Sequence, residues 1–178
     1  MAGAAAFAVL LAGCASSHHA QAPATTSSST APEAGRPDPH RFLAADAAAR
    51  RVRLTMVAAL GSSNNGFNFD DYGRGELIVS VPQGWGVTIV FRNRGSRRTS
   101  CAVVDGARSA TLAFPGATVP DPVQGLSPGG RAQFSFTASR TGSFRIVSLV
   151  PGQAEARMYA VLLVTHGGKP SISARPGP

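Results

Sequence analysis

Side chains that could perform catalytic chemistry are few in this chain, and they are scattered along it. Only 4 histidines and 9 acidic residues occur among 178 residues. Asp70 and Asp71 are neighbours, so in an extended segment their carboxylates point apart. Asp105 and Asp121 fall in separate loops with no histidine beside them. Because no serine–histidine–aspartate arrangement, paired carboxylates or histidine cluster appears in the strand-rich part, we predict that the protein is not an enzyme.

The charge balance favours an anionic partner of some kind. The net charge is +8, and acidic residues are scarce. A field of this sign attracts anions, acidic proteins or negatively charged surfaces. The arginines are spread along the chain without a helical, zinc-binding or RNA-binding motif. We therefore do not expect nucleic acid as a partner.

The N-terminus, residues 1–14, has the pattern of an export signal. Residues 4–11 are apolar, and residues 11–14 read Leu-Ala-Gly-Cys, which resembles the lipobox of bacterial lipoproteins. The resemblance implies a lipid on Cys14 and a protein anchored to the outer face of the bacterial cell membrane. The apolar run is too short to span a bilayer as a helix. No Lys or Arg precedes it, which departs from the usual signal, and a chance cysteine after an alanine-rich run is the other interpretation.

Composition divides the rest into a tether, a domain and a tail. Residues 15–40 are rich in Ala, Ser, Thr and Pro and too poor in large apolar side chains to fold, so we expect a flexible linker. His18 and His19 lie there, and two neighbouring imidazoles alone form no defined metal site. The domain is expected over residues 41–166. A disordered tail is expected over residues 167–178, with His166 exposed before it.

Short alternating apolar segments fill the expected domain. They occur around residues 52–60, 77–81, 87–91, 102–104, 111–114, 134–136, 144–146 and 159–165, separated by Gly, Pro and Asn turns. This pattern is typical of an all-β antiparallel sandwich or small barrel. The nearly continuous apolar run at 159–165 predicts a strand buried on both faces. An alanine-rich run at 42–50 predicts one or two helical turns.

Three motifs, in order, resemble the sulfocyanin-like branch of the cupredoxins. Residues 81–89 read Val-Pro-Gln-Gly-Trp-Gly-Val-Thr-Ile, and residues 125–129 read Gly-Leu-Ser-Pro-Gly before a strand. Residues 147–158 keep the Pro-Gly pair and the methionine of that family's copper loop. The resemblance covers about residues 51–165. It implies a cupredoxin-like Greek-key sandwich of about eight strands and, in the family, a blue-copper electron carrier.

The resemblance also assigns the positions that hold copper in the family. Thr99 falls on the first histidine, Ser148 on the cysteine, Gln153 on the second histidine and Met158 on the methionine. A blue-copper centre needs two imidazoles and a thiolate, with a weak axial thioether. Only Met158 keeps its ligand. We therefore expect a degenerate site with no type 1 copper and no other cofactor.

Cys101 leaves an alternative open. It lies two residues beyond Thr99, so in a strand the two side chains share a side. Cys101 and Met158 are both soft donors that could hold Cu(I). The alternative function is thus a copper-binding electron-transfer protein of the sulfocyanin type with an atypical site. A lone buried cysteine packed as a small hydrophobe is the interpretation we favour.

Arginines surround the expected site. Alternation from residue 144 turns the Ser148 side chain inward, so the four former ligand positions should converge at one end of the barrel. Arg97, Arg98 and Arg157 would then form a cationic rim, suited to carboxylates and phosphates. Solvated arginines without a partner are the plainer interpretation. The expected function is a membrane-anchored extracytoplasmic binding module for an anion or an acidic protein at the membrane surface.

Overall fold

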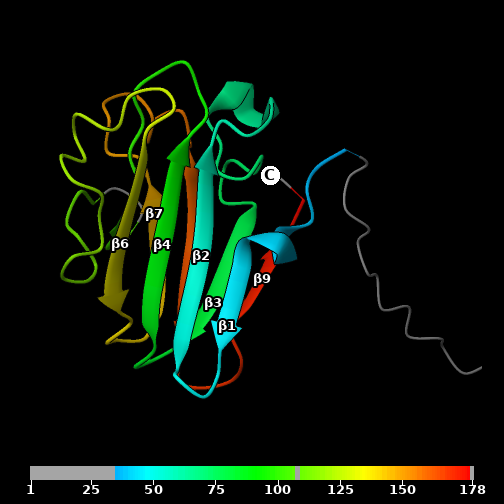
Figure 1. Ribbon diagram of the computed structural model, residues 1–178, viewed down its shortest axis with the longest axis vertical. Coiled ribbons are helices and arrows are strands. Elements are labelled where there is room, and N and C mark those ends of the chain that lie inside the picture. The colour runs from blue at the N-terminus through cyan, green and yellow to red at the C-terminus, as the bar shows by residue number, and fades with distance from the viewer. Residues whose placement is uncertain (1–34, 107–108, 177–178) are drawn as a thin grey trace, which may run out of the picture.

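The computed structural model describes residues 35–106 and 109–176, which form a sandwich of two β-sheets (Figure 1). The front sheet in this view runs in the order β1 (Leu43–Asp46), β2 (Arg51–Ala58), β4 (Gly86–Asn93) and β6 (Arg131–Thr137). The rear sheet runs in the order β5 (Ala102–Val104), β7 (Gly142–Val147), β8 (Tyr159–Thr165), β3 (Leu77–Pro82) and β9 (Ser171–Ala174). The expectation of an all-β sandwich is confirmed.

The sheets are mixed rather than purely antiparallel. β2 pairs with β4 in parallel, and β3 pairs with β8 in parallel. Parallel partners cannot be joined by a tight hairpin, so the chain must cross between them. It does so by passing to the other sheet, since β3 of the rear sheet lies between β2 and β4 in sequence. The prediction of an antiparallel sandwich is wrong for these two pairs.

The core lies between the sheets and follows the alternation of the sequence. Leu77, Val79 and Val81 of β3 are fully buried, as is Phe91 of β4. Phe114, from the 109–125 loop, stacks on Phe136 at 5.1 Å between ring centroids and meets Phe144 edge-on at 4.8 Å. Trp85 is half-buried and packs at the edge of the core. Removal of these apolar surfaces from water is the main stabilising term.

Three local expectations are wrong. Residues 42–50 form no α-helix: the 3₁₀ helix η1 (Pro39–Phe42) leads directly into β1. β8 alternates between fully and partly buried residues, so it is not buried on both faces. The tail is not disordered throughout, because β9 pairs with β3 and Ile172 is 1% exposed in the core. Four residues sufficed for β9 since β3 already supplied an edge to pair with.

The segment before η1 also packs on the domain. The Tyr72 hydroxyl donates to the carbonyl of Pro37 at 2.6 Å, and Arg36 pairs with Glu76 at 3.1 Å. The flexible linker predicted for residues 15–40 is therefore wrong for its last residues. The expected signal peptide, Cys14, and the two histidines at 18 and 19 lie outside the described residues. Within the described part, no helix is long and apolar enough to cross a membrane.

Candidate functional site

Four loops meet at the end of the sandwich toward which β2 and β4 point (Figure 1). They comprise residues 59–76, 94–101, 124–130 and 148–158. Asn64, in the 3₁₀ turn η2 (Ser63–Gly66), donates from Nδ2 to the carbonyl of Ala156 at 2.8 Å and so joins the first loop to the last. This cluster contains every position at which the sequence predicts a former copper ligand.

Ser148 follows β7 and is completely buried. Its Oγ accepts from the backbone N–H of Ser100 at 3.1 Å and from that of Val150 at 3.4 Å, and it lies 3.2 Å from the hydroxyl of Ser100. The Ser100 hydroxyl in turn accepts from the N–H of Leu149 at 2.9 Å. Two backbone donors that converge on one side-chain atom are also suited to a thiolate, because they stabilise negative charge there.

Thr99 is 5% exposed and is held by its backbone. It exchanges two hydrogen bonds with Leu126, of 3.1 and 2.9 Å. The neighbouring Gly125 has φ +67°, and a Cβ there would lie 2.6 Å from Cγ2 of Val150 and 2.9 Å from the carbonyl carbon of Thr99. Glycine is therefore required where the 94–101, 124–130 and 148–158 loops come together.

Gln153 is 5% exposed, and its amide is only half satisfied. Its Nε2 donates to the carbonyl of Arg98 at 2.7 Å, while Oε1 has no hydrogen-bond partner within the described part of the protein. The backbone carbonyl of Gln153 accepts from the N–H of Met158 at 3.0 Å, which closes the loop at the buried thioether. The structure thus places Thr99, Ser148, Gln153 and Met158 in one set of interlocked loops, all four buried.

Comparison with known protein families identifies the family of this chain. A model of the sulfocyanin (SoxE) domain matches residues 40–169, which include all four positions. The chain belongs to the sulfocyanin family.

Relatives of this sulfocyanin-family protein agree with that assignment. A sulfocyanin of Sulfolobus acidocaldarius is 26% identical over 129 residues, 66% of this chain and 65% of that protein. This chain therefore spans slightly less than two thirds of its curated relative. A solved rusticyanin variant matches with a TM-score of 0.50 and 17% identity, over 70% of this chain and 87% of that one. A blue copper oxidase of Nitrosomonas europaea matches with a TM-score of 0.50 and 18% identity, over 64% of this chain and 38% of that one. These two likenesses show the cupredoxin-like fold.

The groups that this sulfocyanin-family chain carries at the four positions do not fit type 1 copper. They are two hydroxyls, an amide and a thioether. The Ser148 oxygen is occupied by backbone donors, and the Gln153 nitrogen is committed to a carbonyl. Copper of the blue type needs two imidazoles and a thiolate. Among the described residues no group of three or more His, Cys, Asp or Glu side chains could hold a metal ion.

The three rim arginines have different surroundings. Arg98 donates to the carbonyls of Gln124 and Gly125 at 2.9 and 2.8 Å, and to the Ser127 hydroxyl at 2.8 Å. Its guanidinium therefore fastens the 124–130 loop. Arg97 lies 5.1 Å from the ring centroid of Phe67. Arg157 is exposed, in the left-handed region with φ 59°.

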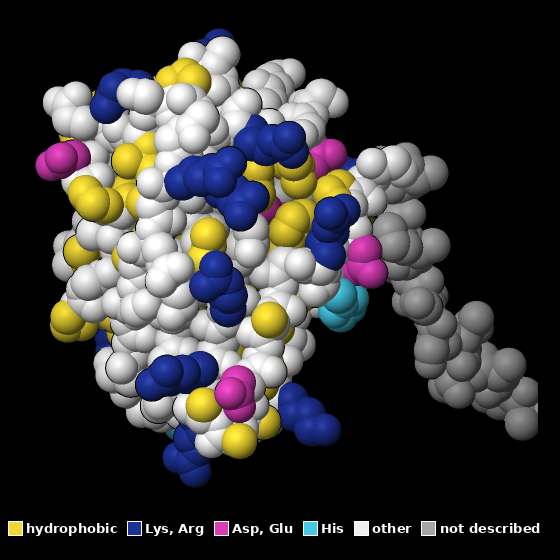
Figure 2. All heavy atoms as spheres, viewed as in Figure 1, with side chains coloured by type: hydrophobic (Ala, Val, Ile, Leu, Met, Phe, Trp, Pro, Cys, Tyr) yellow, Lys and Arg dark blue, Asp and Glu magenta, His cyan; other side chains and the backbone are white. Residues whose placement is uncertain are grey.

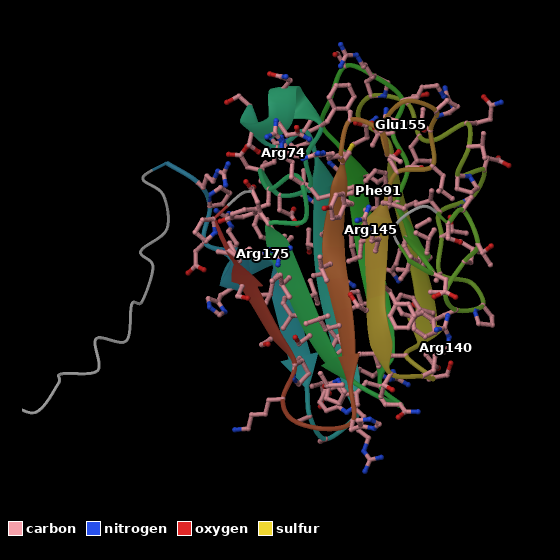
Figure 3. All side chains as sticks on the ribbon, turned by 180° about the vertical axis from the view of Figure 1, so that it is seen from behind. Arg74, Phe91, Arg140, Arg145, Glu155 and Arg175 are labelled. Atoms are coloured by element: carbon pink, nitrogen blue, oxygen red, sulfur yellow. The ribbon has the colours of Figure 1, made fainter. Side chains whose placement is uncertain are left out.

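Another basic residue, Arg74, joins this end of the molecule. Its backbone N–H donates to the carbonyl of Arg157 at 2.9 Å. Figure 3 shows Arg74 at the loop end, where the acidic Glu155 also lies. The positive charge at this end thus comes from the exposed Arg74, Arg94, Arg97 and Arg157. Arg98 chiefly holds the 124–130 loop.

Cys101 lies in the main core and is fully buried. Burial raises the pKa of its thiol well above the usual range, and Asp70 raises it further once that carboxyl is ionised. The side chain is therefore a neutral thiol at neutral pH, which is a poor metal ligand. Packing as a small hydrophobe accounts for its position.

Asn93 and Asp70 are among the buried polar residues of this end that were not predicted from the sequence. Asn93, at the end of β4, donates to the carbonyls of Arg97 and Leu126 at 2.7 and 2.9 Å and accepts from the N–H of Gly95. Asp70 is fully buried, with Oδ1 accepting from Val57 N–H at 2.8 Å and Oδ2 lacking a partner in the described part of the chain. Asn93 occupies an inward position at the end of an alternating segment, and a polar residue at such a position could have indicated a buried hydrogen-bonding role.

Proposed function

We propose that this protein is a sulfocyanin-like cupredoxin that has lost the type 1 copper site and acts as a non-enzymatic binding module. The observation that carries the proposal is the hydrogen bonding at the former ligand positions. Ser148 and Gln153 are built into the loop cluster through the backbone of Ser100, Val150 and Arg98. Side chains committed in this way stabilise the loops themselves, a role that a bound metal ion can serve in a metalloprotein.

The ligand we propose is an anion or an acidic protein that docks at the loop end. Arg97, Arg157 and Arg74 are exposed there, and none of them forms an ion pair with another described residue. Guanidinium groups bind carboxylates and phosphates in a bidentate manner. Arg98 contributes charge but keeps its donors in the 124–130 loop.

The alternative is electron transfer through a copper ion held by Cys101 and Met158. Both side chains are buried in the same core cluster. However, a thiol with a strongly raised pKa must lose its proton in an apolar interior before it can bind, and a thioether adds little affinity. We therefore favour the metal-free module.

The proposed location is the outer face of the bacterial cell membrane, with Cys14 as the lipid attachment site. This proposal rests on the export and lipobox pattern of residues 1–14. Substitution of Cys14 by Ser should release the protein from the membrane fraction of the producing cell. Retention of the variant in that fraction would overturn the anchor.

Copper titration tests the metal-free site. The purified chain should bind no stoichiometric Cu(II) or Cu(I), by metal analysis and by absorption at the thiolate-to-copper charge-transfer band. The triple variant Thr99→His, Ser148→Cys, Gln153→His should gain one coloured copper per chain, because Met158 and the backbone donors at Ser148 are already present. A matched control, Thr99→His with Gln153→His alone, lacks the thiolate and should stay colourless. Tight stoichiometric copper in the unsubstituted chain would overturn the proposal.

The rim is tested separately with defined acidic probes. The double variant Arg97→Ala, Arg157→Ala should bind a polyglutamate peptide roughly three- to tenfold more weakly at low salt, and the difference should shrink as salt screens the charges. The matched control Lys169→Ala, Arg175→Ala removes two exposed charges from residues outside the four loops, although the backbone of Arg175 contacts Glu76. Equal losses in both variants, or none, would refute docking at the rim.

A further inference from the structure

The outer face of the front sheet carries arginines with almost no acidic counter-charge. Strand pairing places Arg51 and Arg53 of β2, Arg92 of β4 and Arg131 of β6 on the same side of the sheet. All four are exposed. On this face the strands contribute one acidic residue, Asp46, which lies directly opposite Arg51. We call Arg53, Arg92 and Arg131 the arginine face; Figure 2 shows Lys and Arg side chains over this side of the molecule.

Arg92 and Arg131 are directly opposite each other on neighbouring antiparallel strands. Like charges in such a pair destabilise a sheet, since their Cβ atoms are only about 5 Å apart. No hydrogen bond or ion pair joins either side chain to another described residue. Arg53 has a single long contact, from Nη1 to Oε1 of Gln133 at 3.4 Å. An anionic surface bound at this pair would neutralise the two charges and so relieve the repulsion.

Arg140, in the turn between β6 and β7, and Arg145 of β7 are placed differently. Arg140 pairs with Asp105 at 3.1 Å and lies 4.6 Å from the ring centroid of Phe144. Arg145 lies 3.9 Å from the ring centroid of Tyr159. Figure 3 shows both arginines on the rear side. Among the arginines of the strands, those without an acidic or aromatic contact thus lie on the front sheet.

The chemistry of the arginine face indicates what it binds. Around the arginines the outward residues are small or polar: Thr55, Gly86, Thr88, Gln133, Ser135 and Thr137, with a half-buried Val90. Protein interfaces depend on a buried cluster of aromatic or large apolar anchors. The one large hydrophobic side chain that is well exposed in the described part is Val123, which lies in a loop. A cationic face without apolar anchors fits a layer of phosphate groups better than a folded protein.

A hollow in the same face supplies further donors. It has a volume of about 680 Å³; its polar lining is Arg51, Thr88, Ser135, Thr137 and Ser139, and its apolar lining is Val87, Pro115 and Phe136. Thr88 and Ser135 are 2.9 Å apart across the β4–β6 pair. One guanidinium with several hydroxyls is a donor set for a phosphate oxygen. In Figure 1 no described segment crosses β2 and β4 at the front, so a flat surface can approach.

We propose that the arginine face docks the domain onto the phosphate headgroups of an anionic membrane. The interaction is independent of the rim and of any lipid on Cys14. It would orient the sandwich with its front sheet against the bilayer and leave the loop end free at the side. Each arginine near an anionic bilayer contributes roughly a fivefold gain in membrane partitioning.

Vesicle binding tests the proposal with the full chain carrying Cys14→Ser, so that no lipid is attached. The face variant adds Arg53→Gln, Arg92→Gln and Arg131→Gln; the matched control adds Arg74→Gln, Lys169→Gln and Arg175→Gln. Binding is measured by co-sedimentation with phosphatidylcholine vesicles that contain or lack 30 mol% phosphatidylglycerol (about a third anionic lipid). Zwitterionic vesicles give the baseline from the apolar N-terminal segment, which all three proteins share.

At low salt, we expect the face variant to lose on the order of 100-fold in partitioning to anionic vesicles, and the control at most a few-fold. Equal losses in the two variants would mean that net charge alone acts, and unchanged binding would mean that the face does not dock; either result overturns the proposal. If the face variant lost polyglutamate binding but kept vesicle binding, the partner of the arginine face would be an acidic protein, and the membrane proposal would be wrong. Melting curves should show the face variant folded, because substitution of the opposed arginines removes a repulsion.

Discussion

Asp70 is the residue whose chemistry is least expected in the interior of a sandwich. Its carboxyl is buried, one oxygen accepts from the N–H of Val57, and the other has no partner in the described structure. Burial raises the pKa of Asp70 well above its usual range, and the Val57 hydrogen bond lowers it by less. The folded protein therefore keeps the proton of this carboxyl to a higher pH than the unfolded chain does, since a buried carboxylate without a cation is disfavoured.

This residue predicts a fall in stability as the pH rises. Between the unfolded-state pKa near 4 and the raised folded-state pKa, the unfolded chain has lost the Asp70 proton and the folded one has kept it, so the free energy of unfolding decreases by about 1.4 kcal/mol per pH unit. Asp70→Asn should remove this decrease, because the amide oxygen keeps the Val57 bond and asparagine tolerates the φ of 57°. Denaturant titrations from pH 4 to 8 measure the difference.

The control for that series is Asp121→Asn, which changes an exposed loop carboxyl that also has positive φ. Parallel pH profiles for the original chain and Asp70→Asn would contradict a raised pKa of Asp70 in the folded protein. A decrease that persists only in the Asp121→Asn variant and the original chain would support it.

Strands and turns are the level at which the sequence was most informative. Period-2 alternation predicted β2, β3, β4, β6 and β7 because each has one face in a common core. It could not predict which strands pair, so neither the parallel β2–β4 contact nor the opposed Arg92–Arg131 pair was visible. Register is a tertiary property, and every register that keeps the same residues inward satisfies the alternation equally well.

In the loops, too, the sequence predicted the kind of structure but not which residues contact one another. The motifs around Pro151 and Gly152 predicted where the former ligand positions lie in the chain. They could not show that Ser148 and Gln153 are bound by the backbone of residues 98, 100 and 150, since those partners are some 50 positions distant or depend on loop geometry. The hydrogen bonds by which Arg98 holds the 124–130 loop were missed for the same reason. An arginine in a loop is expected to be solvated unless the positions of its carbonyl acceptors are known.

Across the whole molecule, the two ends of the described chain close the same side of the sandwich. The η1 segment packs against β9, β1 and β2, and β9 extends the rear sheet beyond β3. The backbone N–H of Arg175 donates to the carbonyl of Glu76, whose carboxylate pairs with Arg36. The C-terminal segment therefore contributes to global stability, although its composition of Gly, Pro and Ser predicts disorder. Composition cannot predict a strand this short, because only one of its residues is a large apolar side chain.

Ile172 tests that contribution. It is the apolar residue of β9 in the core, 1% exposed and opposite Val79 of β3. Ile172→Ala should lower the free energy of unfolding by about 2–5 kcal/mol, because it removes buried methyl groups and leaves a cavity. Ser173→Ala, at the next and exposed position, is the matched control and should change it by less than about 0.5 kcal/mol. Both variants are measured by denaturant unfolding, with the slope compared to check that the transition stays two-state. If the two substitutions had equally small effects, β9 would pair with β3 without contributing to the cooperative unfolding of the domain.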